Sequence, residues 1–253
     1  MKYLLSLIAT LVITLTSTFS YSDNTVKVLI VLTSNSQLGD TGRKTGFWLP
    51  ELTHPYYELK DAGYSIDIAS IQGGMAPIDP DSYDDKDDHN NRFLNDALLM
   101  SKVIKSIPIK NVDPSDYSIV LYSGGSGTMW DFPNNEHVNR ISKEIYENNG
   151  VVSAVCHGPA ALIGVKLSNG NYLVSGKKVA AFTNDEEADI EQTDILPFLL
   201  QDKLKERGAH HVYGESWGEN VVVDGRLITG QNPASAKKVA TEIIAYFKSK
   251  KHK

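Results

Sequence analysis

The stretch Val151-Val152-Ser153-Ala154-Val155-Cys156-His157-Gly158-Pro159-Ala160 indicates a strand that turns abruptly into a helix at the only cysteine of the chain. The β-branched run is typical of a buried strand, and the small residues and proline that follow are typical of a helix start. A turn this tight would project the Cys156 side chain out of the fold, as at a nucleophile elbow. The N-terminus of the next helix would favour its thiolate. The alternative is a buried structural cysteine, because free cysteine is among the most buried residue types.

The first 22 residues have the pattern of a secretory signal peptide. Lys2 precedes an uncharged, largely apolar run over residues 4–19, and small residues at Ser20 and Ser22 would allow cleavage after Ser22. The run is short for a membrane span, although a retained anchor is the alternative. We therefore expect a signal peptide over 1–22 and a mature protein over 23–253. This protein would lie in the periplasm or outside the cell, without stable membrane association.

Composition narrows the class of protein. The 253-residue chain carries 25 basic and 31 acidic side chains, with a formal net charge of −6, which argues against a nucleic-acid partner. A single cysteine cannot form an internal disulfide. In an exported protein a free thiol is a liability unless it is buried or has a role in catalysis. The spacing of Cys and His suggests no structural zinc site, and we expect neither a metal nor a cofactor.

Apolar runs of strand length alternate with segments of helical periodicity, which predicts βαβ units and a mainly parallel sheet covered on both faces. The predicted strands are residues 26–32, 64–69, 118–122, 151–155 and 178–182. The predicted helices are residues 50–62, 91–105, 135–148, 195–207 and 234–247. Residues 221–228 predict a hairpin with an Asp-Gly turn. We expect one α/β domain with two polar insertions.

The insertions are residues 34–47, which are polar and glycine-rich, and residues 73–91, which are acidic. A calcium loop is the more specific interpretation of 73–91. It lacks the glycine at the sixth position and the glutamate at the twelfth that such a loop uses. A solvated loop is therefore the prediction.

Functional sites in open parallel α/β sheets lie beyond the carboxyl ends of the strands. After strand 118–122, the run Ser123-Gly124-Gly125-Ser126-Gly127 leaves backbone N–H groups unobstructed. Gly124 and Gly125 therefore predict an oxyanion site facing Cys156. A plain tight turn needs the same residues, so the interpretation depends on the neighbouring elbow.

Carboxylates follow two other predicted strands. Glu186 and Glu187 come after strand 178–182, where a carboxylate could orient His157, or where both could simply be acidic residues of a helix's first turn. Glu51 stands in an apolar neighbourhood after the first strand, and burying a carboxylate is costly unless it is protonated or paired. A protonated Glu51 could donate to the cysteine sulfur or transfer protons; the alternative is an exposed helical glutamate.

Taken together, these motifs resemble the ThiJ/PfpI superfamily, which is related to class I glutamine amidotransferases. Within it they resemble the branch of heat-shock chaperones and glutathione-independent glyoxalase III enzymes. The resemblance is carried, in the family's order, by residues 45–55, 77–82, 113–131, 154–160 and 229–235. It implies a flavodoxin-like three-layer sandwich that is commonly a homodimer.

The resemblance also implies roles for individual residues. Cys156 would be the nucleophile with His157 beside it, and Glu51 would hydrogen-bond the cysteine. The third member of the triad falls on Glu187 by spacing from Phe182, with Glu186 as the alternative. Gly125 and the backbone of His157 would hold the oxyanion.

The function implied is the cofactor-free conversion of a small 2-oxoaldehyde, such as methylglyoxal, to a hydroxy acid. The alternatives are a holdase-type stress chaperone and a cysteine peptidase. One departure is Ser126, which stands where the branch usually has histidine in Gly-Gly-His-Gly. The chain also lacks the His-x-Glu pair that the amidotransferases use near the C-terminus, so glutamine hydrolysis is not expected.

Overall fold

The computed structural model describes residues 26–251, so the predicted signal peptide over 1–22 lies outside the described residues. The strands of the central sheet are β1 (Lys27–Leu32), β2 (Ser65–Ser70), β3 (Ile107–Pro108), β4 (Ile119–Tyr122), β5 (Val151–Val155), β8 (Val221–Asp224) and β9 (Leu227–Gly230). They run in the order β3-β2-β1-β4-β5-β9-β8. Every pairing is parallel except that of β8 with β9. The predicted mainly parallel sheet and C-terminal hairpin are confirmed.

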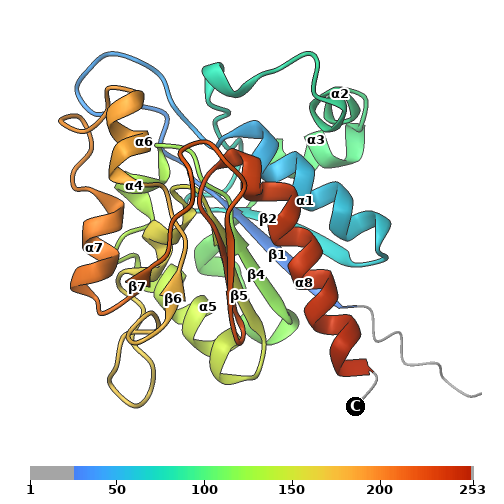
Figure 1. Ribbon diagram of the computed structural model, residues 1–253. Coiled ribbons are helices and arrows are strands. Elements are labelled where there is room, and N and C mark those ends of the chain that lie inside the picture. The colour runs from blue at the N-terminus through green and yellow to red at the C-terminus, as the bar shows by residue number, and fades with distance from the viewer. Residues whose placement is uncertain (1–25, 252–253) are drawn as a thin grey trace, which may run out of the picture.

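Helices cover both faces of this sheet (Figure 1). One face carries α1 (Leu49–Asp61), α2 (Asp88–Leu94), α3 (Ala97–Ile104) and α8 (Ala236–Lys251). The other carries α4 (Thr128–Asp131), α5 (Glu136–Glu147) and α7 (Leu200–Glu206). Successive residues of a strand point to opposite faces of the sheet and so pack against different helices. Ile30 lies in the core under α1 and α8, whereas Val31 lies in the core on the α5 side. The predicted three-layer α/β sandwich is therefore confirmed.

Two predicted helices differ from the structure. Residues 91–105 form two helices, not one, because the Asp96 side chain accepts hydrogen bonds from the backbone N–H groups of Leu98 and Leu99 and starts α3 anew. The helix predicted over 195–207 begins only at Leu200, since Pro197 lies inside the predicted span and favours extended backbone before it.

The predicted strand over 178–182 is wrong as a member of the central sheet. Only β6 (Lys178–Val179) is a strand, and it pairs with β7 (His210–His211) in a separate two-stranded sheet. β9 occupies the place beside β5. The following residues instead cross the end of β5, where the backbone N–H of Phe182 donates to the carbonyl of Cys156 at 3.0 Å. This crossing still brings α6 (Asn184–Asp189) to the cysteine.

The order of the sheet places the carboxyl ends of β4 and β5 side by side. The loop after β4 and the residue after β5 therefore meet at one edge of the sheet.

Within residues 26–251, no helix is both long and apolar enough to cross a lipid bilayer.

Candidate active site

Cys156 follows β5 directly and has a backbone φ of +60°, a conformation that non-glycine residues rarely adopt. Its backbone N–H donates to the carbonyl of Gly230 at 3.0 Å, and its carbonyl accepts from Phe182. Both neighbouring segments thus hold the residue in this strained turn. The predicted sharp corner is present at the predicted residue.

The environment of the thiol differs from the sequence prediction. Cys156 is 3 % exposed, although it lines a pocket, and only a 3₁₀ helix, Gly158–Leu162, follows it. Burial raises the pKa of the thiol well above its usual value, and the negative charge of Glu51 adds to this when that group is ionised. The backbone N–H groups of Gly125 and His157 oppose the shift. The expected thiolate is therefore a neutral thiol at rest, because burial outweighs the short helix.

His157 lies between the cysteine and a buried carboxylate. Its Nδ1 is 3.3 Å from Cys156 Sγ, and its Nε2 is 2.9 Å from Glu187 Oε2. His157 and Glu187 are both 2 % exposed, and the imidazole also packs on the ring of Phe182 with centroids 4.3 Å apart. With the carboxylate on Nε2, the tautomer that donates to Glu187 leaves Nδ1 free to accept from the thiol.

Glu51 lies in the first turn of α1 and is fully buried. Its Oε2 accepts a 2.8 Å hydrogen bond from the backbone N–H of Gly124, and the carboxyl group also interacts with the Cys156 thiol. Burial raises the pKa of Glu51 from 4.5 to about 8. At neutral pH the group is therefore mostly a neutral acid next to the sulfur, and the exposed helical glutamate is excluded.

The two glycines after β4 have different surroundings. A Cβ on Gly124 would lie 2.5 Å from Glu51 Oε2 and 2.6 Å from the carbonyl oxygen of Val155. Gly125 has a φ of +99°, and its N–H is directed at the Cys156 sulfur. The expectation that both N–H groups face a bound oxyanion is wrong for Gly124, because its N–H is already donated to Glu51.

The adjacent glutamates Glu186 and Glu187 point to different partners. Glu186 Oε1 accepts from the Trp217 backbone N–H at 2.8 Å and from the side-chain amides of Gln231 and Asn232. Its Oε2 accepts from the backbone and hydroxyl of Thr183. These donors lower the pKa of Glu186 despite its burial. Of the two glutamates, Glu187 hydrogen-bonds His157 and Glu186 does not.

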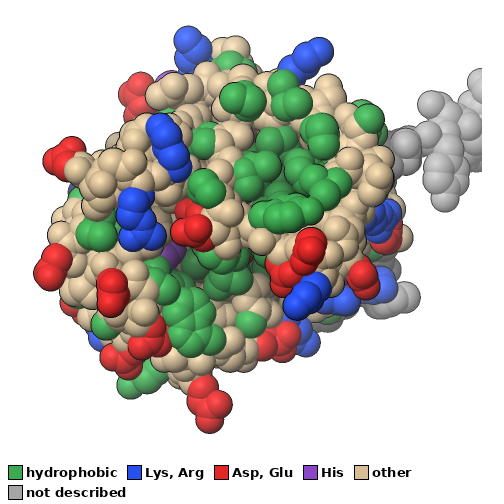
Figure 2. Space-filling view, turned by 90° about the horizontal axis from the view of Figure 1, so that it is seen from above, with side chains coloured by type: hydrophobic (Ala, Val, Ile, Leu, Met, Phe, Trp, Pro, Cys, Tyr) green, Lys and Arg blue, Asp and Glu red, His purple; other side chains and the backbone are tan. Residues whose placement is uncertain are grey.

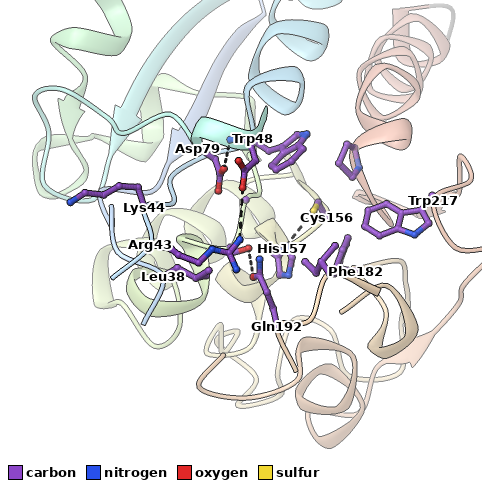
Figure 3. Close-up of a pocket in the computed structure, with 15 residues that line it drawn as sticks. Leu38, Arg43, Lys44, Trp48, Asp79, Cys156, His157, Phe182, Gln192 and Trp217 are labelled. Atoms are coloured by element: carbon purple, nitrogen blue, oxygen red, sulfur yellow. Dashed lines mark hydrogen bonds and ion pairs between the residues drawn. The ribbon is translucent and has the colours of Figure 1, made fainter. Parts of the chain in front are cut away.

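Cys156 and His157 open onto a pocket of about 270 Å³. Figure 2 views the molecule from above and shows a hollowed face with hydrophobic and charged side chains around it. The close-up in Figure 3 shows side chains from several loops gathered around the cysteine and histidine. Besides Cys156, His157 and Gly125, the pocket is lined by Leu38, Arg43, Lys44, Trp48, Asp79, Asp81, Ser126, Phe182, Ile190, Gln192, Trp217 and Pro233.

The sequence interpretation missed most of this lining. Both predicted insertions reach the pocket: Arg43 comes from the first and Asp81 from the second, and the two form an ion pair of 3.8 Å. Asp79, expected in a solvated loop, is 6 % exposed and accepts from the Thr45 hydroxyl at 2.8 Å. Polar loops that fold back over a strand end leave no periodic signal in the sequence.

One group of side chains among the described residues could hold a metal ion. His54 on α1 and Asp87 and His89 at the start of α2 place their donor atoms within 4.8 Å of one another. His54 Nε2 lies 2.6 Å from Asp87 Oδ2. None of the three lines the pocket, so this group is separate from Cys156. The sequence interpretation missed it because the donors come from distant segments.

Comparisons with known proteins identify relatives over most of the chain. The model of the DJ-1/PfpI family matches residues 44–246. The chain is 37 % identical to glyoxalase 3 of Candida albicans over 88 % of this chain and 98 % of the relative. It is 34 % identical to the glutathione-independent glyoxalase HSP31 of Saccharomyces cerevisiae, with the same coverage. The solved structure of Rapid Encystment Protein 24 kDa of Francisella tularensis superposes with a TM-score of 0.85 at 43 % identity, covering 87 % of this chain and 98 % of that one.

Proposed function

The chain belongs to the DJ-1/PfpI family, and we propose that within it this protein is a glutathione-independent glyoxalase that converts methylglyoxal to lactate. Relatives with nearly full-length similarity bear that name. The observation that carries the proposal is the convergence of Cys156, His157, Glu187 and Glu51 at one pocket. A thiol, a base and a protonatable carboxyl group are the parts that such an isomerisation needs.

The first step is addition of sulfur to the aldehyde. Nδ1 of His157 accepts the thiol proton as Sγ bonds to C1, and Glu187 stabilises the imidazolium through Nε2. The C1 oxygen takes the electron pair of the carbonyl bond and is held by the N–H groups of Gly125 and His157. Return of the proton to this oxygen gives a hemithioacetal. The neutral resting thiol is consistent with this order, because the proton leaves as the bond forms.

The second step moves a proton between adjacent carbons. Ionised Glu51 removes the proton from C1, the electron pair forms the C1=C2 double bond, and the C2 oxygen takes a proton from water, which gives an enediol. The same carboxyl group returns its proton to C2 while the C1 hydroxyl loses its proton to water, which leaves a thioester. C1 is oxidised to a thioester while C2 is reduced to an alcohol, so no external oxidant or reductant takes part. The raised pKa of Glu51 suits this role, since a group near 8 both accepts and releases a proton at neutral pH.

The third step is hydrolysis. Water adds to the thioester carbonyl with His157 as the base, and the thiol leaves with a proton. The overall change is methylglyoxal plus water to lactate, with the enzyme unchanged.

The test is direct. Purified protein is incubated with methylglyoxal in the absence of glutathione, and lactate is measured for the wild type and Cys156→Ala. We expect lactate from the wild type and none above background from the variant. Equal activity in the two proteins would reject the mechanism, and suppression of aggregation without lactate from either would favour the chaperone alternative.

We also propose that the protein is exported and that it forms a homodimer. The signal-like pattern over residues 1–22 supports export, and the tendency of the family to dimerise supports the second point. Cell fractionation together with the mass of the mature N-terminal peptide tests the first. Sedimentation of the purified protein tests the second, and a monomer at micromolar concentration would contradict it.

A further inference from the structure

The pocket wall contains a polar pair that the mechanism above does not use. Ser126, one residue after Gly125, donates its hydroxyl to Gln192 Oε1 at 2.8 Å. The two residues are 7 % and 8 % exposed, and both line the pocket that contains Cys156. Figure 3 shows Gln192 in this pocket. A buried hydrogen bond thus joins the loop after β4 to the segment after α6.

The backbone of Gln192 is fixed with respect to the proposed triad. Its N–H donates to the carbonyl of Glu187 at 3.1 Å, and its own carbonyl accepts from Ile195 and Leu196. The serine hydroxyl then fixes the far end of the side chain by engaging Oε1. Both ends of the glutamine are therefore held, which presents its amide nitrogen in a defined direction.

That amide nitrogen has no hydrogen-bond partner within the described part of the chain. Although Gln192 as a residue is 8 % exposed, this nitrogen is not one of the side-chain atoms buried without a partner, so its N–H is available to an acceptor outside the protein. Because Gln192 lines the pocket, this N–H can donate to a molecule that occupies the pocket. The position of Ser126 in the chain also places the pair next to Gly125, whose N–H is directed at the sulfur.

We propose that Gln192 binds the C2 oxygen of the 2-oxoaldehyde through its side-chain N–H, and that Ser126 is the residue that positions it. This inference rests on the proposed glyoxalase function. The backbone donors serve the oxygen on C1, and the oxygen on C2 lies one bond further along the substrate. It changes from carbonyl to hydroxyl during the proton transfer, so a neutral donor suits it at every stage.

The pair also accounts for the serine at position 126, where the resemblance leads one to expect histidine. An imidazole could carry an N–H into the pocket itself. A serine hydroxyl already donated to Gln192 cannot, and the glutamine supplies the N–H in its place. The substrate class this selects is a carbonyl compound with an acceptor oxygen next to the reacting aldehyde.

Two substitutions of Gln192 test whether it binds substrate or only holds the Ser126 loop in place through its hydrogen bond. Gln192→Glu keeps an acceptor for the Ser126 hydroxyl but has no N–H, whereas Gln192→Met has neither. We expect both variants to lose about 10- to 100-fold in kcat/KM for methylglyoxal. In the uncharged variant Gln192→Met, alkylation of Cys156 by iodoacetamide should stay within about twofold of the wild-type rate, because the sulfur and its neighbours are untouched. Gln201→Glu, outside the pocket, serves as the matched control and should retain wild-type activity.

The outcomes are distinguishable. If Gln192→Glu keeps wild-type kcat/KM while the wild type makes lactate, Gln192 does not bind substrate and only the glyoxalase proposal stands. If the wild type makes no lactate, the proposed function itself falls, and this inference with it. Should Gln192→Met fail to fold, Gln192→Glu and Ser126→Ala still decide, and for Ser126→Ala we expect a smaller loss, mainly in KM.

Discussion

The carboxyl group of Glu51 accepts a hydrogen bond of 2.8 Å from the backbone N–H of Gly124, in a site from which solvent is excluded. This contact ties the first turn of α1 to the loop after β4. It also fixes the carboxyl group beside the Cys156 thiol. The first turn of α1, Gly124 and Cys156 therefore form one connected unit.

The activity should rise with pH below about 8. Proton transfer requires ionised Glu51, whose pKa burial raises to about 8, so the ionised fraction increases about tenfold per pH unit well below that value. The kcat for lactate formation, measured between pH 5.5 and 9, should follow this increase and then level off. A rate that is flat over pH 5.5 to 8 would show that Glu51 is not the base.

Glu51 should also make the fold less stable as pH rises. Its pKa is higher in the folded protein than the ordinary 4.5, so the folded state binds the extra proton between about 4.5 and 8. Stability from this group is complete below that window and is lost through it, by a few kcal/mol on the order of the shift. Urea unfolding of Glu51→Gln should show a smaller decline from pH 5 to 8 than the wild type. Parallel declines would contradict the shift.

Gly124→Ala should lower both the stability of the fold and the activity, although it adds only one methyl group. The added Cβ would meet Glu51 Oε2 at 2.5 Å and Val155 O at 2.6 Å, and neither can move freely. We expect a loss of about 1–3 kcal/mol in the free energy of unfolding and a large loss of activity. Gly214→Ala is the control: neither Gly124 nor Gly214 has a positive φ, and a Cβ on Gly214 would meet its nearest neighbour, Asn220 Cβ, at an ordinary 3.4 Å. Equal stability of the two variants would refute the packing argument.

Replacement of either of the adjacent glutamates Glu186 and Glu187 by glutamine should affect a different property: stability for Glu186 and kcat for Glu187. Glu187→Gln loses one partner, His157, so the fold should persist while kcat drops about 100-fold or more. Glu186→Gln turns one oxygen into a donor facing other donors, and should cost about 1–3 kcal/mol of stability. Thermal unfolding and kcat measured on both, with exposed Asp185→Asn as control, check this. A stable Glu186→Gln would contradict the role of Glu186 as an anchor.

Much of the fold follows from the sequence because periodicity and glycine positions are local signals. The β-branched run before Cys156 and the Asp-Gly turn of the hairpin each specify their own structure. The prediction of a central strand over 178–182 is based on the length and composition of this apolar run, which suit a strand. It is wrong because β9 occupies the position beside β5. Competition between segments for one place is a property of the whole chain.

In the site, too, some features follow from local sequence signals and others depend on tertiary structure. Cys156 and His157 are adjacent in sequence, and Glu187 lies close to a predicted strand end, so their chemistry could be proposed in advance. The state of the thiol could not, because burial is set by residues from many segments. The contact of Ser126 with Gln192 spans 66 positions and joins two loops. Such contacts depend on tertiary structure and carry no local pattern.

The central claim is that Cys156 carries the substrate as a thioester during turnover. Wild-type protein is mixed with methylglyoxal, quenched in acid within the first turnovers, and examined by intact mass and peptide mapping. A hemithioacetal reverts on denaturation, whereas a thioester survives and is cleaved by hydroxylamine. We predict one added substrate mass on the Cys156 peptide of the wild type, removed by hydroxylamine, and none in Glu51→Gln. Lactate production by the wild type with no such adduct, or by Cys156→Ala at the wild-type rate, would contradict the account.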